Sequence, residues 1–195
     1  MADDLLALLP ARRAAFPRRT AWDLARYSAV LEGNFIYWMT GAFIAAKSEE
    51  ARSIILENLH EEVRDSHPER LRRFEIAAHA QPTESDALAV YANLSKVRLF
   101  IGKLPAAPIV TMVAFFEGFI QRFMPYLEEL AEKQGSTERE YTQVHAVCDI
   151  AHPQELFHAL EAELALSSDA RELEEYLYEG VYLLRALIVD MFVAA

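Results

Sequence analysis

The chain has 195 residues and a mass of 22.1 kDa, which allows one well-buried core but not two ordinary domains. Its formal net charge of −11 and its sequence pI of about 5.0 disfavour binding to a phosphate backbone, so we expect no nucleic-acid partner. The single cysteine, Cys148, excludes an internal disulfide framework and fits a reducing compartment. The first residues lack the basic start of a secretory signal, and no apolar run reaches membrane-spanning length without a charge. We therefore expect a cytoplasmic protein with no membrane partner.

The composition favours helices over a turn-rich β fold. Hydrophobic residues make up 53% of the chain, glycines number only six, and the strong helix formers Ala, Leu, Glu and Arg dominate the rest. The predicted fold class is therefore all-α: a single domain over residues 1–195, built as a bundle of about seven helices around one core. Residues 1–19 are predicted to form an N-terminal arm.

Helix boundaries are predicted from apolar spacing and from capping and proline residues. Thr20 suits the N-cap of a first long helix, and Ser48 followed by two glutamates begins a second. Pro68 disfavours helical geometry at His67, so the chain is expected to bend there before the next helix. Pro153 is expected to kink the helix that contains it without ending it. The predicted helices cover residues 21–47, 49–65, 68–78, 86–101 and 109–133, a stretch from beyond residue 137 to 166, and residues 170–192.

Two acidic residues interrupt apolar helix faces. Glu32 breaks the apolar face of the first long helix, and Glu117 stands within the most apolar helix of the chain. Burying a carboxylate costs several kcal/mol unless it is paired with a base or bound to a cation. For Glu117 two interpretations follow: a salt bridge to Arg122 or another basic residue, or a metal ligand.

The stretch 57–68 is rich in acids and histidines. Glu57 and His60 form an ExxH pair on one helical face, the arrangement of ferritin-like di-iron bundles. Glu62 and His67 are a second candidate pair, because the bend before Pro68 lets the histidine swing back toward the glutamate. Periodicity does not choose between the pairs, and a solvated acidic helix end is a third interpretation.

The pattern HxxxDxxH occupies residues 145–152. On a helix, positions four and seven apart return to nearly the same angle, so His145, Asp149 and His152 share one face. Two imidazoles and a carboxylate suit iron, manganese or zinc. The pattern therefore predicts a metal site, and surface histidines beside an unrelated aspartate are the alternative.

Read in order, these motifs resemble the heme-oxygenase-like di-iron oxidases and oxygenases, a family of iron-containing redox enzymes. The resemblance covers roughly residues 21–165 and rests on Ala51, Arg52, Leu56, Asn58, Leu59 and Glu62, then His67, Leu71 and Phe74, then Phe116-Glu117, and finally HxxxDxxH. It implies metal ligands at Glu62, His67, Glu117, His145, Asp149 and His152. Some members of the family draw a further carboxylate from the first core helix, which makes Glu32 a less certain candidate, alongside Glu57 and His60.

The resemblance also implies a function. The expected cofactors are two Fe(II)/Fe(III) ions, with O2 as co-substrate and an external electron donor. The expected substrate is a small molecule (an amino acid, an amine or a fatty acid) that undergoes N-oxygenation, desaturation or C–C cleavage, in natural-product biosynthesis. A homodimer is compatible with the sequence. Two alternatives stay open: a metal-free enzyme of the same fold, like thiamin-salvage hydrolases or cofactor-free oxidases, and a non-enzymatic helical metal-binding or interaction protein.

Several further side chains have a structural and a functional interpretation. The aromatic and methionine side chains of two apolar helices can wall a substrate pocket, although such stripes more often fill a bundle core; they are Phe35, Tyr37, Trp38, Met112, Phe115, Phe116 and Phe119. Arg26, Arg64 or Arg122 can hold a substrate carboxylate or neutralise a neighbouring acid.

Overall fold

The structure is a computed structural model that describes residues 17–148, 151–166 and 176–192. Within these ranges the regular elements are all α-helices, with no strand, which confirms the predicted all-α class. The helices are α2 (Pro17–Leu31), α3 (Asn34–Ala45), α4 (Glu49–Arg64), α5 (His67–Ala77), α6 (Glu84–Gly102), α7 (Ala106–Lys133), α8 (Glu140–Cys148), α9 (His152–Leu164) and α11 (Glu179–Phe192).

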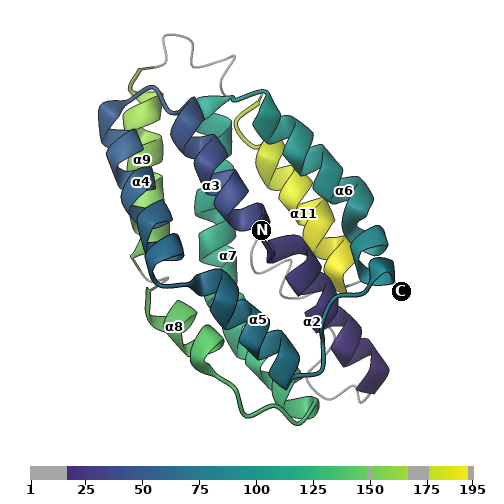
Figure 1. Ribbon diagram of the computed structural model, residues 1–195. Helices are drawn as coiled ribbons and strands as arrows, with labels where there is room; N and C mark the ends of the chain where they lie inside the picture. The colour runs from purple at the N-terminus through teal and green to yellow at the C-terminus, as the bar shows by residue number, and fades with distance from the viewer. Residues whose placement is uncertain (1–16, 149–150, 167–175, 193–195) are drawn as a thin grey trace.

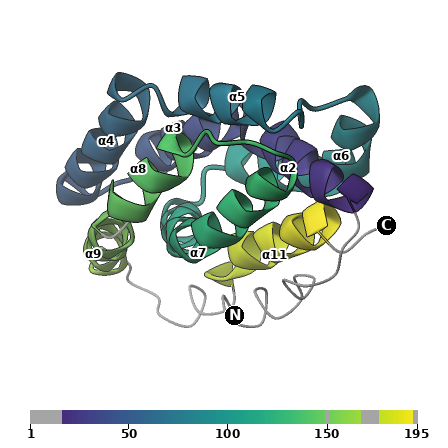
Figure 2. The same ribbon diagram turned by 90° about the horizontal axis from the view of Figure 1, so that it is seen from below.

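Helix α7 runs through the middle of the bundle (Figures 1 and 2). It packs against α2, α3, α8, α9 and α11, while α4 packs on α3 and α9, and α6 packs on α2 and α11. Seen from below, α4, α8 and α9 lie to one side of α7, and α2, α6 and α11 lie to the other (Figure 2). Among the described helices α7 alone is long and apolar enough to cross a membrane, but 78% of its most apolar window is buried inside the protein, as expected for a core helix.

Two helix starts follow from their capping residues. The Ser48 hydroxyl accepts a hydrogen bond from the backbone N–H of Ala51 at 3.3 Å, and two acids occupy the first turn of α4. Thr83 and Asp86 form a reciprocal capping box, in which each side chain accepts a hydrogen bond from the other's backbone N–H. This box starts α6 at Glu84, two residues earlier than predicted.

The predicted long helix over residues 21–47 is wrong in one respect, because it is two helices. Gly33 separates α2 from α3 with φ of 73°, a left-handed conformation that glycine adopts without steric cost. The apolar periodicity continues across this break, which is why the pattern does not reveal it. The first of the two helices also begins earlier than predicted, at Pro17, since the fixed φ of proline suits a first helical position.

The helix carrying HxxxDxxH also differs from the prediction. The chain forms α8 up to Cys148 and a new helix, α9, from His152, and residues 149–150 lie outside the described part of the chain. Pro153 stands in the first turn of α9, where a missing N–H removes no intrahelical hydrogen bond. The last helix begins at Glu179, after a turn at residues 177–178, and the predicted start at residue 170 lies outside the described residues.

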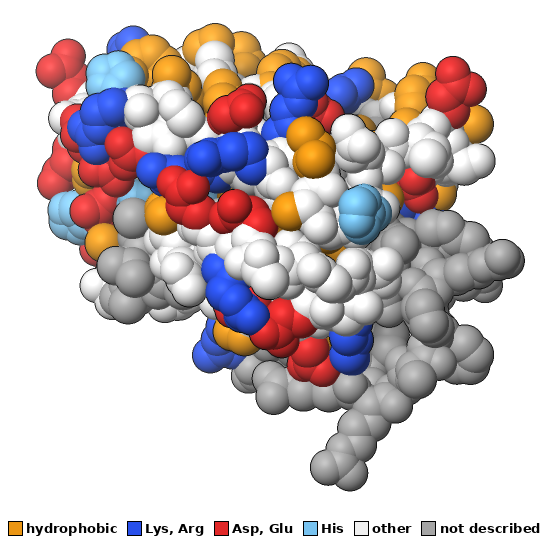
Figure 3. All heavy atoms as spheres, turned by 60° about the horizontal axis from the view of Figure 1, so that its bottom comes forward, with side chains coloured by type: hydrophobic (Ala, Val, Ile, Leu, Met, Phe, Trp, Pro, Cys, Tyr) orange, Lys and Arg blue, Asp and Glu red, His pale blue; other side chains and the backbone are white. Residues whose placement is uncertain are grey.

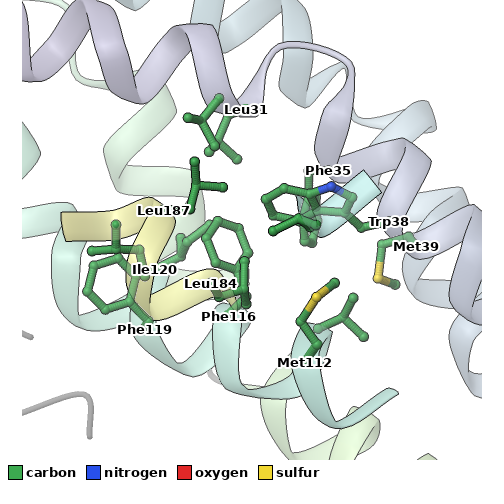
Figure 4. Close-up of a cluster of buried hydrophobic side chains, with 14 of the residues drawn as sticks. Leu31, Phe35, Trp38, Met39, Met112, Phe116, Phe119, Ile120, Leu184 and Leu187 are labelled. Carbon is green, nitrogen blue, oxygen red and sulfur yellow. The ribbon is translucent and has the colours of Figure 1, made fainter. Parts of the chain in front are cut away.

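The apolar core gathers around Phe116 of α7 (Figure 4). The Trp38 and Phe35 rings lie 5.1 and 5.6 Å from the Phe116 ring, centroid to centroid. Trp38, Met112, Phe116 and Phe119 are all buried, which confirms their interpretation as core. Burying one such side chain contributes about 1.5–3 kcal/mol.

Two further aromatic candidates do not line the core. Tyr37 is 42% exposed, and Phe115 is half-buried against Phe157 and Tyr178.

The lower face of the molecule carries interspersed basic and acidic side chains (Figure 3). Arg70 and Arg73 of α5 contact Glu140 of α8 at 3.3 and 3.0 Å. These partly exposed pairs contribute little free energy each, but they join the two helices that cover this end of the bundle.

Candidate metal centre

Five of the six predicted ligands lie in the described part of the chain, and all five are buried. They come from five different helices: Glu62 from α4, His67 from α5, Glu117 from α7, His145 from α8 and His152 from α9. None exceeds 5% exposure. Segments far apart in the sequence thus bring carboxylates and imidazoles to one place in the interior.

These side chains form two overlapping groups that could each hold a metal ion. Glu62, His67 and His145 make the first, and Glu62, Glu117 and His152 make the second; within each group the potential ligand atoms lie within 4.8 Å of one another. Bonds of about 2.0–2.2 Å from one ion to nitrogen and oxygen ligands span nearly this separation. Glu62 belongs to both groups, so one carboxylate faces two potential metal positions.

The turn between α4 and α5 creates the contact between Glu62 and His67. Ser66 adopts a left-handed conformation with φ of 55°, and α5 then begins at His67 with Pro68 in its first turn. The bend turns the histidine back, so that its Nδ1 lies 2.8 Å from Glu62 Oε1. His67 Nε2 is buried and has no hydrogen-bond partner among the described residues.

His145 is held by its own helix. Its Nδ1–H donates to the backbone carbonyl of Tyr141, one turn earlier, at 2.8 Å, which leaves the Nε2 lone pair as the ligand atom. Burial, and to a lesser degree the nearby His67, lower the pKa of His145 from 6.5 to about 4, against the opposing effect of Glu62. The imidazole is therefore neutral at pH 7, as metal coordination requires.

His152 is held from a different helix. Its Nε2 lies 2.8 Å from Glu61 Oε2, and the Glu61 side chain is one-third exposed at the edge of α4. The sequence analysis missed Glu61, because in the run Glu61-Glu62 nothing in the spacing distinguishes a ligand from a residue that contacts a ligand.

The less certain candidates belong to neither group. Glu32, Glu57 and His60 are all exposed, whereas Glu62 and His67 are buried. Glu32 instead lies near Glu75. Burial raises the pKa of Glu75 from 4.5 to about 7, and its carboxyl group is hydrogen-bonded to the Ser28 side chain. Asp149 lies outside the described residues, so its role as a ligand stays a prediction.

A pocket of about 420 Å³, counting the space open to solvent, adjoins the ligands. The polar residues of its lining, in the described part of the chain, are four candidate ligands and Tyr141, whose hydroxyl is hydrogen-bonded to that of Tyr27 at 2.7 Å. The rest of the lining is apolar or glycine: Leu31, Gly33, Phe35, Ile36, Pro68, Leu71 and Ile120.

None of the three candidate arginines lines the pocket. Arg26 donates to the Asp190 carbonyl at 3.3 Å, Arg64 contacts Asp65 and Glu61, and Arg122 is exposed.

The donor set fits a metal ion. Carboxylate oxygens and neutral imidazole nitrogens suit iron, manganese or zinc. If His67 Nδ1–H donates to Glu62, the buried Nε2 carries a lone pair that no described residue bonds, and a bound cation would satisfy it. Cations would also offset the cost of burying Glu62 and Glu117.

A helical bundle that buries carboxylates and imidazoles from five helices around a pocket has the form of a metalloprotein, and its fold is heme-oxygenase-like. The model of the iron-containing redox enzyme family matches residues 23–184, so the chain belongs to that family. This match confirms the resemblance found in the motifs. Comparison with curated proteins and with solved structures gave no match.

Proposed function

We propose that the protein is a non-heme di-iron oxidoreductase that uses O2 to oxidise a small molecule. The observation that carries this proposal is the sharing of Glu62 between two ligand groups. A carboxylate that faces two positions can bridge two cations, which is how carboxylate-rich bundles hold a pair of irons. The proposed ligands are Glu62, His67, Glu117, His145 and His152, together with Asp149.

When bound, iron supplies the electrons that reduce O2 and hence the oxidising power acting on the substrate. The protein's own residues do the rest. Tyr141 fixes the tautomer of His145 through its backbone carbonyl, and burial keeps that imidazole neutral. The apolar walls formed by Leu31, Leu71 and Ile120 limit access of water to the reacting end of the pocket.

The pocket also bears on the substrate class. Among the described residues that line it there is no lysine or arginine that could pair with a substrate carboxylate. Its apolar side chains suit a hydrocarbon segment placed beside the metal positions. Among amino acids, amines and fatty acids, the lining therefore favours a molecule that places an apolar chain in the pocket, such as an alkyl amine or the hydrocarbon part of a fatty acid whose carboxylate lies outside it, undergoing desaturation, N-oxygenation or C–C cleavage.

The remaining parts of the proposal concern the electron donor, the cellular setting and the oligomeric state. Each turnover needs an external electron donor when the substrate supplies fewer electrons than O2 accepts. We place the reaction in natural-product biosynthesis in the cytoplasm and propose a homodimer as the working form.

The test is anaerobic loading with Fe(II), followed by iron analysis and by O2 uptake in the presence of fatty acids, amines and amino acids. We expect about two irons per chain and faster O2 uptake with a substrate that has an apolar chain. Asp149→Ala should lose most of this acceleration. Absence of iron uptake would instead favour a metal-free enzyme in which these histidines and acids transfer protons. Iron uptake without any substrate-dependent O2 consumption would favour a non-enzymatic metal-binding protein.

A further inference from the structure

We propose that Glu61 is a positioning residue for the metal centre: it orients the His152 imidazole toward Glu62 and Glu117. This inference rests on the proposed function, since it assigns a role to a residue that would not itself bind metal. It places beside the ligand set a carboxylate that no motif indicates.

The contact that carries the inference is the 2.8 Å distance between His152 Nε2 and Glu61 Oε2. The imidazole is 3% exposed, while the carboxylate is 33% exposed. If Nε2–H donates to this carboxylate, Nδ1 carries the lone pair with which His152 could bind a cation in the group containing Glu62 and Glu117. A carboxylate on the far nitrogen of a ligating histidine fixes the tautomer and makes the ligand more basic.

The position of His152 explains why it needs a partner from another helix. His145 lies within α8, and the Tyr141 carbonyl one turn earlier orients its ring. His152 is the first residue of α9, so the turn before it is not part of its own helix. Glu61 of α4, which packs alongside α9, takes the place of that carbonyl (Figure 1).

Glu61 is itself held in place. Its other oxygen, Oε1, lies 3.7 Å from a guanidinium nitrogen of Arg64, one turn later in α4. Arg64 also contacts Asp65 at 3.2 Å. The carboxylate is thus held between a buried imidazole and a surface arginine.

The same helix pair contains a matched control. Glu50 of α4 contacts His158 of α9 with an oxygen–nitrogen distance of 3.0 Å, and both side chains are more than half exposed. This contact has the same chemistry and joins the same two helices, but neither residue belongs to a ligand group. If Glu61 served only to hold α4 against α9, loss of either contact should have the same effect on metal binding.

The experiment compares Glu61→Gln, Glu61→Met and Glu50→Met in the full-length protein. Glutamine keeps an oxygen that can accept from Nε2–H, and methionine keeps the length of the side chain without that oxygen. Binding of Co(II) and Fe(II) is measured anaerobically by competition with a chelator, the Co(II) absorption spectrum is recorded, and thermal unfolding of the metal-free proteins is followed.

We expect Glu61→Met to weaken the binding of one metal equivalent by about 10–100-fold and to alter the Co(II) spectrum. Glu61→Gln should recover most of the affinity, and Glu50→Met should bind like the wild type. Equal metal affinity and identical Co(II) spectra for Glu61→Met and Glu50→Met would overturn the inference and leave the proposed function intact. Failure of the wild type to bind either metal would overturn both.

Discussion

Phe116 and Glu117 are neighbours in α7, yet they belong to two different regions of the molecule. Phe116 points into a cluster of Phe35 and Trp38 that is stabilised by apolar burial (Figure 4). Glu117 joins a ligand group with Glu62 and His152. Successive helical residues are about 100° apart, so one helix can serve both regions.

The comparison shows where stability and where function reside. The apolar region drawn in Figure 4, with side chains from α2, α3, α7 and α11, gains free energy from burial alone and needs no ligand. The ligand-bearing region, formed by α4, α5, α8 and α9 against α7, buries polar and charged groups whose cost a cation would offset. Damage to the first should therefore lower stability, and damage to the second should lower metal binding.

The largest effect on stability is expected from the apolar region. Trp38 is fully buried between Phe35 and Phe116, and Trp38→Ala should lower the free energy of unfolding by about 3–5 kcal/mol, because it removes the ring and leaves a cavity. Urea denaturation measures the loss. Metal affinity under folding conditions should stay unchanged, and a loss of less than about 1 kcal/mol would contradict the role given to the cluster.

A smaller effect is expected from a polar contact of α9 that is independent of metal. Glu163 is buried, and its Oε1 accepts hydrogen bonds from the backbone N–H groups of Lys47 and Ser48, both at 2.7 Å. Glu163→Ala should lower the free energy of unfolding by about 2–4 kcal/mol, because it leaves two donors unsatisfied. Thermal or urea unfolding measures this, with the exposed Glu161→Ala as control; equal stability of the two variants would count against it.

The smallest effect is a pH dependence at the edge of the ligand-bearing region. Burial raises the pKa of Glu75 from 4.5 to about 7, so between these values the folded state binds more protons than the unfolded state. The contribution of the Glu75 carboxyl to the free energy of unfolding is therefore fully present below pH 4.5 and is lost as the pH rises through 7. Glu75→Gln should therefore be more stable than the wild type by roughly 1–3 kcal/mol at pH 8, and the difference should vanish at pH 4.5. Urea denaturation at both pH values measures it, and a pH-independent difference would refute this assignment.

The helical class and most helix positions could be predicted, because apolar periodicity and caps such as Thr83 are local properties of the chain. The break at Gly33 could not, since one glycine does not interrupt the apolar pattern around it. The bend at Ser66 was predicted through Pro68, although its left-handed conformation has no sequence signature at serine.

The residues of the candidate site were harder to predict from local sequence spacing than the helices. Spacing alone did not distinguish the pair Glu57 and His60 from the pair Glu62 and His67 as candidate ligands. The resemblance to the family implied the second pair. In the structure Glu62 and His67 are buried and Glu57 and His60 are exposed, and the ligand roles stay a prediction. Glu61 was not found, because its contact with His152 joins residues 91 positions apart and depends on how α4 packs against α9.

The central claim is that Glu62 serves two metal positions at once. Anaerobic Fe(II) titration of Glu62→Gln, Glu117→Gln and Glu57→Gln tests it, because the three variants change charge equally and only the first affects both ligand groups. We predict loss of both iron equivalents in Glu62→Gln, weakening of one in Glu117→Gln and wild-type uptake of about two irons in the exposed control Glu57→Gln. Retention of about two tightly bound irons by Glu62→Gln would contradict the account.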